Sequence, residues 1–212
     1  LPAVAQQFAQ FPGMAMTVHQ VLPGSGQHAN RVAVWFSEHG ASGGVGGPKA
    51  VWSGVAIYHA QGDQLVFCCA QEDYTTRSRQ LRSGVADPVD PPASAPWDTP
   101  VLDAAPQAEE VVRQWLTQSW PQPNASVRVD DDHITGTPLH FEAHSTEVID
   151  MFSGGSDVAF SVHQRGKYQG GLPGVTTSDR VQVLKANGII RSYRGPGGGY
   201  QIDADPSELS IW

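Results

Sequence analysis

Two parts of this chain, 126 residues apart, carry the same residues in the same order. The matched pairs are Val32 with Val158, Ala33 with Ala159, Gly40 with Gly166, Ala60 with Ala186, Gly62 with Gly188 and Tyr74 with Tyr200. Self-similarity at a fixed spacing is typical of a repeated structural unit. We therefore expect a duplicated domain, so that any fold assigned to one half must also suit the other.

A proline-rich stretch separates the two parts. Residues 84–106 contain six prolines, and each proline fixes φ and lacks a backbone donor. Such a stretch predicts an extended, semi-rigid connector. We expect a first domain at residues 1–83, a linker at residues 84–105 and a second domain at residues 106–212.

The first half has mostly the pattern of β-strands. Apolar residues alternate over residues 32–37, and residues 51–59 and 65–70 are rich in β-branched and aromatic side chains. Gln61-Gly62-Asp63 predicts a turn between the last two, which makes a hairpin. A short helix is expected at residues 4–10.

The second half repeats this pattern after one clear helix. Helical spacing of apolar residues predicts a helix over residues 106–120. Residues 140–150 and 157–164 predict a strand pair, and Asn187-Gly188 predicts the turn of a second hairpin. The expected class is α+β, with two tandem units that each hold a curved antiparallel sheet and few helices.

Composition excludes several classes of protein. Thirteen basic and 21 acidic residues give a net charge of −8, which argues against nucleic-acid binding. No apolar stretch reaches 18 residues, so we expect no membrane span. Cys68 and Cys69 are adjacent, which excludes a disulfide scaffold and favours a cytoplasmic location. No cofactor or metal is expected.

Three segments resemble the SnoaL-like polyketide cyclase branch of the nuclear transport factor 2-like superfamily. They are RVAVWFSEHGASGG, VWSGVAIYHAQGDQLVFCCAQEDYTTRSRQL and DVAFSVHQRGKYQGGLPG, about half of the chain. The resemblance implies a cone, which is a curved antiparallel sheet around a pocket. In that family helices and a first strand come before the segment that begins here at Leu1. We therefore expect either that the first domain is incomplete at its N-terminus, or that each half takes its lid from the other half or from another chain.

The resemblance makes Asp73 the leading candidate for a general acid/base. Proton removal beside a carbonyl needs a carboxylate whose pKa is raised by an apolar pocket. The alternative is that Asp73 caps a helix over the residues that follow it. The matching position in the second half is Gly199, so we expect that site to be degenerate.

His39 and His59 are candidate proton partners for Asp73, since histidine titrates near neutral pH. Either could instead be an ordinary surface or packed residue. Four aromatic residues are candidates for binding a ring-shaped apolar ligand, with core packing as the alternative. They are Trp35, Trp52, Tyr58 and Phe67.

Two further groups of residues, one on a single strand and one of two cysteines, are weaker candidates for a functional site. His140, Glu142 and His144 alternate along one strand and have the residue types of a metal site. Three such positions span about 13 Å, too far for one ion, so a solvated or pocket-lining polar face is favoured. Cys68 and Cys69 point to opposite sides of a strand and are expected to fill the core.

Three functions remain open, and with them whether the chain is an enzyme. The first is a cofactor-independent cyclase or isomerase acting on a hydrophobic cyclic carbonyl compound such as a polyketide. The alternative is a non-catalytic scaffold that binds a hydrophobic small molecule or forms a homodimer. The third is an epoxide hydrolase, for which Glu38 and Asp73 are the obvious carboxylate pair in the first half.

Overall fold

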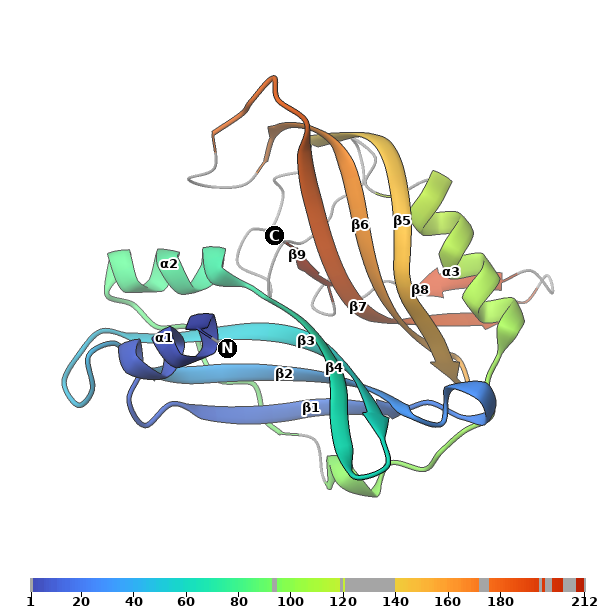
Figure 1. Ribbon diagram of the computed structural model, residues 1–212. Helices are drawn as coiled ribbons and strands as arrows, with labels where there is room; N and C mark the ends of the chain where they lie inside the picture. Colours follow the sequence, from blue (N-terminus) through green and yellow to red (C-terminus); the bar gives the residue numbers. More distant parts are fainter. Residues whose placement is uncertain are drawn as a thin grey trace.

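Two antiparallel sheets make up most of the computed structural model (Figure 1). It describes residues 2–92, 95–118, 120, 140–171, 176–194, 196, 200–203 and 209–211. None of the described helices is long and apolar enough to cross a membrane.

The first sheet has four strands in sequential order. They are β1 (Ala15–Pro23), β2 (Arg31–Ala41), β3 (Lys49–Gln61) and β4 (Gln64–Glu72). Helix α1 (Pro2–Gln10) precedes the sheet and α2 (Tyr74–Ser83) follows it. Gly62 forms the β3–β4 turn with a φ of 62°, a conformation in which glycine has no steric penalty.

The second sheet follows helix α3 (Pro106–Gln118). Its strands are β5 (His140–Gly154), β6 (Asp157–Gly170), β7 (Gln182–Arg194), β8 (Tyr200–Asp203) and β9 (Leu209–Ile211). The order is β5-β6-β7-β8, and β9 also pairs with β7. The proline-rich stretch between the halves holds only a short 3-10 helix, η2 (Pro96–Asp98), among its described residues.

The α+β class is confirmed, as are the expected helices, the first hairpin and the β5–β6 pair. Strand β1 was not predicted from the sequence. Its side chains are mostly half-buried, without a regular inside–outside alternation, which explains the weak strand pattern.

The predicted turn at Asn187-Gly188 is wrong, because both residues lie inside the continuous strand β7. Asn187 is fully buried. Its side-chain amide donates to the carbonyl oxygens of Val55 at 3.0 Å and Cys69 at 2.9 Å in the first sheet. The tertiary partners of Asn187 therefore override its turn preference.

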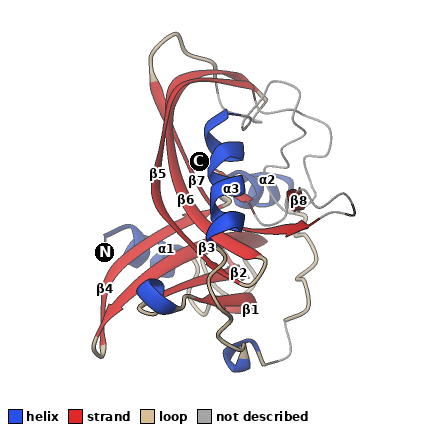
Figure 2. Ribbon diagram, turned by 90° about the vertical axis from the view of Figure 1, so that its right-hand side faces the viewer, coloured by secondary structure: helices blue, strands red, loops and turns tan. Residues whose placement is uncertain are grey.

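The two sheets pack against each other through a shared core. One buried cluster takes residues from both halves: Leu22, Ala33, Val55, Ile57, Phe152, Ala159 and Ile189. Figure 2 shows the second sheet rising from the first, with α3 against its face. The halves therefore share buried apolar area, in addition to a cluster of the second half alone, around α3, and a smaller one of the first half alone, around Trp52.

The spacing of 126 residues holds for β2 and β6 but not for β3 and β7, the strands that pair with them. Val32 pairs with Tyr58, and Val158 pairs with Ile190. The partner strands are thus 132 residues apart (190 minus 58). Both halves have a helix followed by an antiparallel meander, although the constant spacing that suggested duplication ends at the third strand.

Candidate functional site

The four predicted ligand-binding aromatics lie on two opposite faces of the first sheet. Side chains two apart on a strand, and directly paired across strands, share a face. Val32 pairs with Tyr58, and Glu38 pairs with Trp52, so Tyr58 and Trp52 share the face that α1 covers. Trp35 and Phe67 lie on the other face, towards the second sheet. These side chains do not line one pocket.

Asp73 is the N-cap residue of α2, which is the structural alternative considered from the sequence. Its Oδ1 accepts from the backbone amides of Thr75 and Thr76, each at 2.9 Å. The residue is 1% exposed. Burial raises its pKa to about 6, against the hydrogen bonds from Thr76 and Thr75. Its counterpart Gly199 lies outside the described residues.

The two candidate histidines lie at opposite ends of β2 and β3. His39 pairs with Val51, and its Nε2 lies 3.3 Å from Oγ1 of Thr17. His59 pairs with Arg31, eight residues away along β2, which corresponds to about 26 Å. The structure therefore does not bring these two histidines together at Asp73.

His59 forms part of a tie between the sheets. Its Nε2 lies 2.6 Å from Oδ2 of Asp150 on β5, and Arg31 binds the other oxygen of that carboxylate. The ring of Phe67 lies 4.5 Å from the ring of His59. The hydrogen bonds of Arg31 and His59 to Asp150 therefore hold the first sheet against β5 of the second sheet.

A carboxyl pair that the sequence did not suggest lies under α1. Glu38 on β2 and Glu72 on β4 hydrogen-bond to each other, and Nε2 of Gln7 donates to both. Gly54 lies between them on β3, where an added Cβ would meet Phe36 Cζ at 2.6 Å and Glu72 Cγ at 3.0 Å. The absence of a side chain at Gly54 leaves room over β3 for the carboxyl groups of its two neighbouring strands, β2 and β4, to meet.

Burial and the charge of Glu72 raise the pKa of Glu38 to about 7. The indole N–H of Trp52 donates to Glu72 at 2.9 Å, and the Tyr74 hydroxyl donates to Gln7 at 3.0 Å. Two carboxyl groups in contact share one proton, because like charges at that distance cannot both ionise. The pair can therefore give or take a proton near neutral pH.

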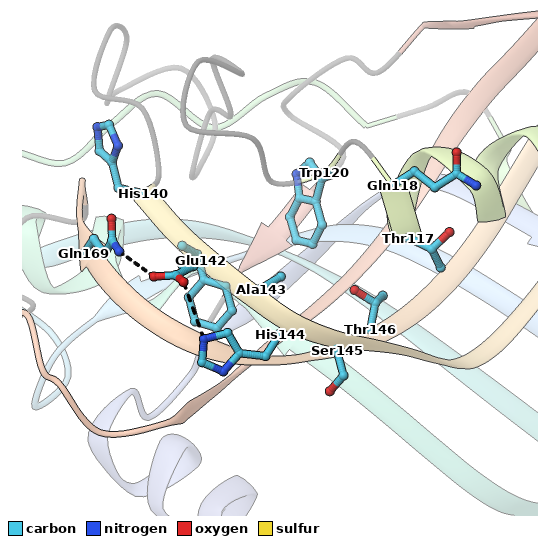
Figure 3. A pocket seen from close by; sticks show the side chains of 11 residues that line it. Thr117, Gln118, Trp120, His140, Glu142, Ala143, His144, Ser145, Thr146 and Gln169 are labelled. Atoms are coloured by element: carbon cyan, nitrogen blue, oxygen red, sulfur yellow. Dashed lines mark hydrogen bonds and ion pairs between the residues drawn. The ribbon is translucent and has the colours of Figure 1, made fainter.

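A hollow with a largely polar lining lies in the other half, beside the start of β5 (Figure 3). It has a volume of about 520 Å³, within the range of small-molecule sites. Its lining residues come from α3, β5 and β6 and from Trp120. They are Thr117, Gln118, Trp120, His140, Phe141, Glu142, Ala143, His144, Ser145, Thr146 and Gln169.

Glu142 is the centre of the polar lining. Gln169 donates to its Oε2 at 2.9 Å, and His144 Nε2 lies 3.8 Å from its Oε1, as the dashed lines in Figure 3 mark. His140, Glu142 and His144 all line the cavity, which fits the pocket-lining one of the two alternatives, solvated or pocket-lining, that the sequence left open. No group of three potential metal ligands occurs among the described residues.

Trp120 supplies an unsatisfied donor at the same cavity. It is 3% exposed, and its indole N–H is buried without an acceptor among the described residues. A buried donor that lacks a partner costs about 1–3 kcal/mol. A ligand oxygen in the cavity is one group that could accept from it.

Comparisons with protein-family models, curated proteins and solved structures find no match to this chain.

Proposed function

We propose that this protein binds a small polar molecule in the cavity beside β5, without transforming it. The observation that carries the proposal is the lining itself: a cavity of about 520 Å³ that contains Glu142, two histidines and Trp120, whose buried N–H has no acceptor among the described residues. A few convergent polar groups in a concave site are typical of ligand recognition.

The lining favours a ligand that carries both hydroxyl and amino groups. The carboxyl group of Glu142 suits a cationic or hydrogen-bond-donating partner, whereas Trp120 requires an acceptor such as a hydroxyl oxygen. His140, His144 and Gln169 can donate or accept. A polar ligand of this kind differs from the hydrophobic ring compound expected for the first half.

A non-catalytic role is supported by the structural contacts that the candidate site residues of the first half make. Asp73 caps α2, His59 binds Asp150, and Trp52 is fully buried against Phe11 with ring centroids 4.9 Å apart. Each of these three residues therefore makes a structural contact within the folded chain.

Three sugars of different charge test the proposal by saturation-transfer NMR at pH 6.5: glucosamine, glucose and glucuronate. We expect binding to weaken in that order, because Glu142 attracts the amine and repels the carboxylate. Glu142→Gln should remove the charge preference. The matched control is Glu147→Gln, an exposed carboxylate on the same strand but outside the cavity lining. Equal signals from all three sugars, or no signal, would contradict the proposal.

The Glu38–Glu72 pair supports a second candidate, the acid/base catalyst implied by the SnoaL-like resemblance. In this version the pair replaces Asp73 as the proton carrier, and the curved sheets of the two halves are duplicated cones. The substrate is a hydrophobic cyclic carbonyl compound. The third candidate, an epoxide hydrolase, is less well supported, because Glu38 contacts Glu72 directly and leaves no place for a water between the carboxyl groups.

Deuterium exchange tests this second candidate. Cyclohexanone in D₂O would be incubated with the protein at pD 7, and loss of its α-proton signal followed by NMR. Acid/base catalysis at the pair predicts faster exchange than in buffer, and a loss of that acceleration in Glu38→Gln but not in Glu147→Gln. An exchange rate equal to that of buffer would exclude the pair as a base for this class of carbonyl compound.

A further inference from the structure

We propose that the ligand of the cavity beside β5 consists of two sugar units, an amine-bearing unit in that cavity and an uncharged unit in a second hollow next to it. This inference rests on the proposed function and names the class of ligand more closely: a disaccharide with one amino group. Two observations carry it. The two spaces share lining residues, and the second hollow has a balanced set of charges.

The second hollow lies where β5 begins and β6 ends. It has a volume of about 370 Å³ and is lined by residues of both strands and by residues 177–179. Glu142 and Gln169 line this hollow and also line the cavity beside β5. The two spaces therefore meet at one pair of side chains, and a ligand in one space can extend into the other.

The shared pair marks the boundary between the two spaces. Gln169 donates to Oε2 of Glu142 at 2.9 Å, and both residues are exposed. Figure 3 shows the pair at the end of the cavity lining that lies away from Thr117 and Gln118. A molecule that fills the cavity and continues past the pair enters the second hollow. The bond between its two units would then lie over Glu142 and Gln169.

Lys167 gives the second hollow a cation that a ligand can use. It pairs with Glu142 across β5 and β6, so the two side chains share one face of the sheet, where opposite charges usually attract. Glu142 accepts from Gln169 instead, and Lys167 forms no ion pair with the residues that the structure describes. Its ammonium group has three N–H donors, which suit the hydroxyl oxygens of a ligand.

Three further residues of the second hollow suit hydroxyl groups. Thr177 and Ser178 each have a hydroxyl that can donate and accept, and the carboxyl group of Asp179 accepts. Apart from the shared Glu142, the hollow therefore has one cation and one anion. An uncharged sugar, whose hydroxyls both donate and accept, matches this mixture. An apolar group would bury these polar side chains without hydrogen bonds, which is costly.

The charges also set which unit lies in which space. The cavity beside β5 has no lysine or arginine in its lining, so an amine there meets Glu142 without a repelling side chain of that kind. In the second hollow the same amine would meet Lys167. The amine-bearing unit is therefore assigned to the cavity and the uncharged unit to the second hollow.

Three sugars test this inference by calorimetric titration at pH 6.5. They are glucosamine, lactosamine, which is glucosamine with galactose attached at O4, and the β-1,4-linked dimer of glucosamine, which also offers a unit linked through C1. We expect lactosamine to bind about tenfold more tightly than glucosamine, which corresponds to about two net hydrogen bonds from the second unit. The amides of residues 177–179 should shift in the NMR spectrum with lactosamine but not with glucosamine.

A double variant tests the role of the second hollow without changing the net charge. Lys167→Gln with Asp179→Asn should remove the difference between lactosamine and glucosamine and leave the affinity for glucosamine unchanged. The matched control is Lys185→Gln with Glu147→Gln, which removes two exposed charges outside both linings. This control should keep the tenfold difference.

The results separate this inference from the proposed function. If glucosamine binds but neither disaccharide binds more tightly, the ligand does not extend into the second hollow, and this inference is wrong while the proposed function stands. The inference is also wrong if Lys167→Gln with Asp179→Asn keeps the whole difference. If none of the three sugars binds, the proposed function and this inference are both overturned.

Discussion

Asp73 illustrates why a carboxylate at a strand end is ambiguous in sequence. The residue types that suit a general base also suit an N-cap, because both need a carboxylate oxygen aimed at a donor. Only the dihedral angles and the amides of Thr75 and Thr76 decide between them. The neighbouring Glu72, one residue earlier, faces the other side of the strand and meets Glu38, a pairing that needs the strand register to be known.

Replacing Asp73 tests the capping role. Asp73→Ala removes the acceptor for two amides and should lower the free energy of unfolding by about 1 kcal/mol. Asp73→Ser keeps a capping oxygen and should recover most of that loss. Urea denaturation followed by circular dichroism measures both. An unchanged midpoint in Asp73→Ala would contradict the capping assignment.

Glu38 makes stability depend on pH. Its pKa rises from 4.5 to about 7 on folding, chiefly through burial. The folded state therefore binds this proton more tightly than the unfolded state. The stabilisation is fully present below pH 4.5 and is lost as the pH rises through 7.

Thermal unfolding between pH 4.5 and 8.5 measures this dependence. Glu38→Gln should flatten the fall in melting temperature near pH 7, whereas the exposed Glu147→Gln should leave it unchanged. Asp73 acts in the same direction, with a pKa raised from 3.8 to about 6, so some fall should remain below pH 7. A profile of Glu38→Gln that matches the wild type would show that the pair does not hold the proton.

At the scale of elements, local patterns were sufficient where neighbouring residues decide the structure. Helix α3 has a clear apolar stripe, and the first hairpin has strong strand residues around a glycine turn. Strand β1 was missed because its faces are not cleanly apolar and polar. Strand β7 was broken in the wrong place because a buried Asn187 was taken for a turn residue.

Gly54 provides a test of strand packing. Gly54→Ala brings a Cβ against the ring of Phe36 and the side chain of Glu72, and such overpacking costs about 1–3 kcal/mol. Gly40→Ala on β2 is the matched control, because its nearest neighbour would be Met14 Cα at 3.4 Å. Chemical denaturation should show a clear loss for the first variant and little change for the second.

At the scale of the whole molecule, polar ties between the sheets join residues about 90 to 130 positions apart. Asp150 binds His59 and Arg31, and Asn187 binds two backbone carbonyls. The cavity lining likewise joins α3 to β5 and β6. No local pattern encodes such pairings, so the sequence predicted several of the long strands and several polar residues but not the partners that these residues would meet.

Replacing Asn187 tests whether its hydrogen bonds make the two halves unfold as one unit. Asn187→Ala leaves a buried gap and removes two hydrogen bonds, and should lower the free energy of unfolding by about 2–4 kcal/mol. The control is Asn30→Ala, whose amide makes one exposed contact of 3.4 Å. The unfolding of Asn187→Ala, followed by tryptophan fluorescence and by circular dichroism, would separate into two transitions if this tie is needed for cooperativity.

The most direct test of the proposed ligand site is a two-dimensional ¹H–¹⁵N NMR titration with glucosamine. The Trp120 indole N–H gives its own resonance, which Trp120→Phe identifies. Binding beside β5 predicts that this resonance and the amides of residues 140–146 shift together with one saturation curve. Shifts confined to Glu38, Glu72 and α1, with the Trp120 signal unmoved, would contradict the account and favour a site in the first half.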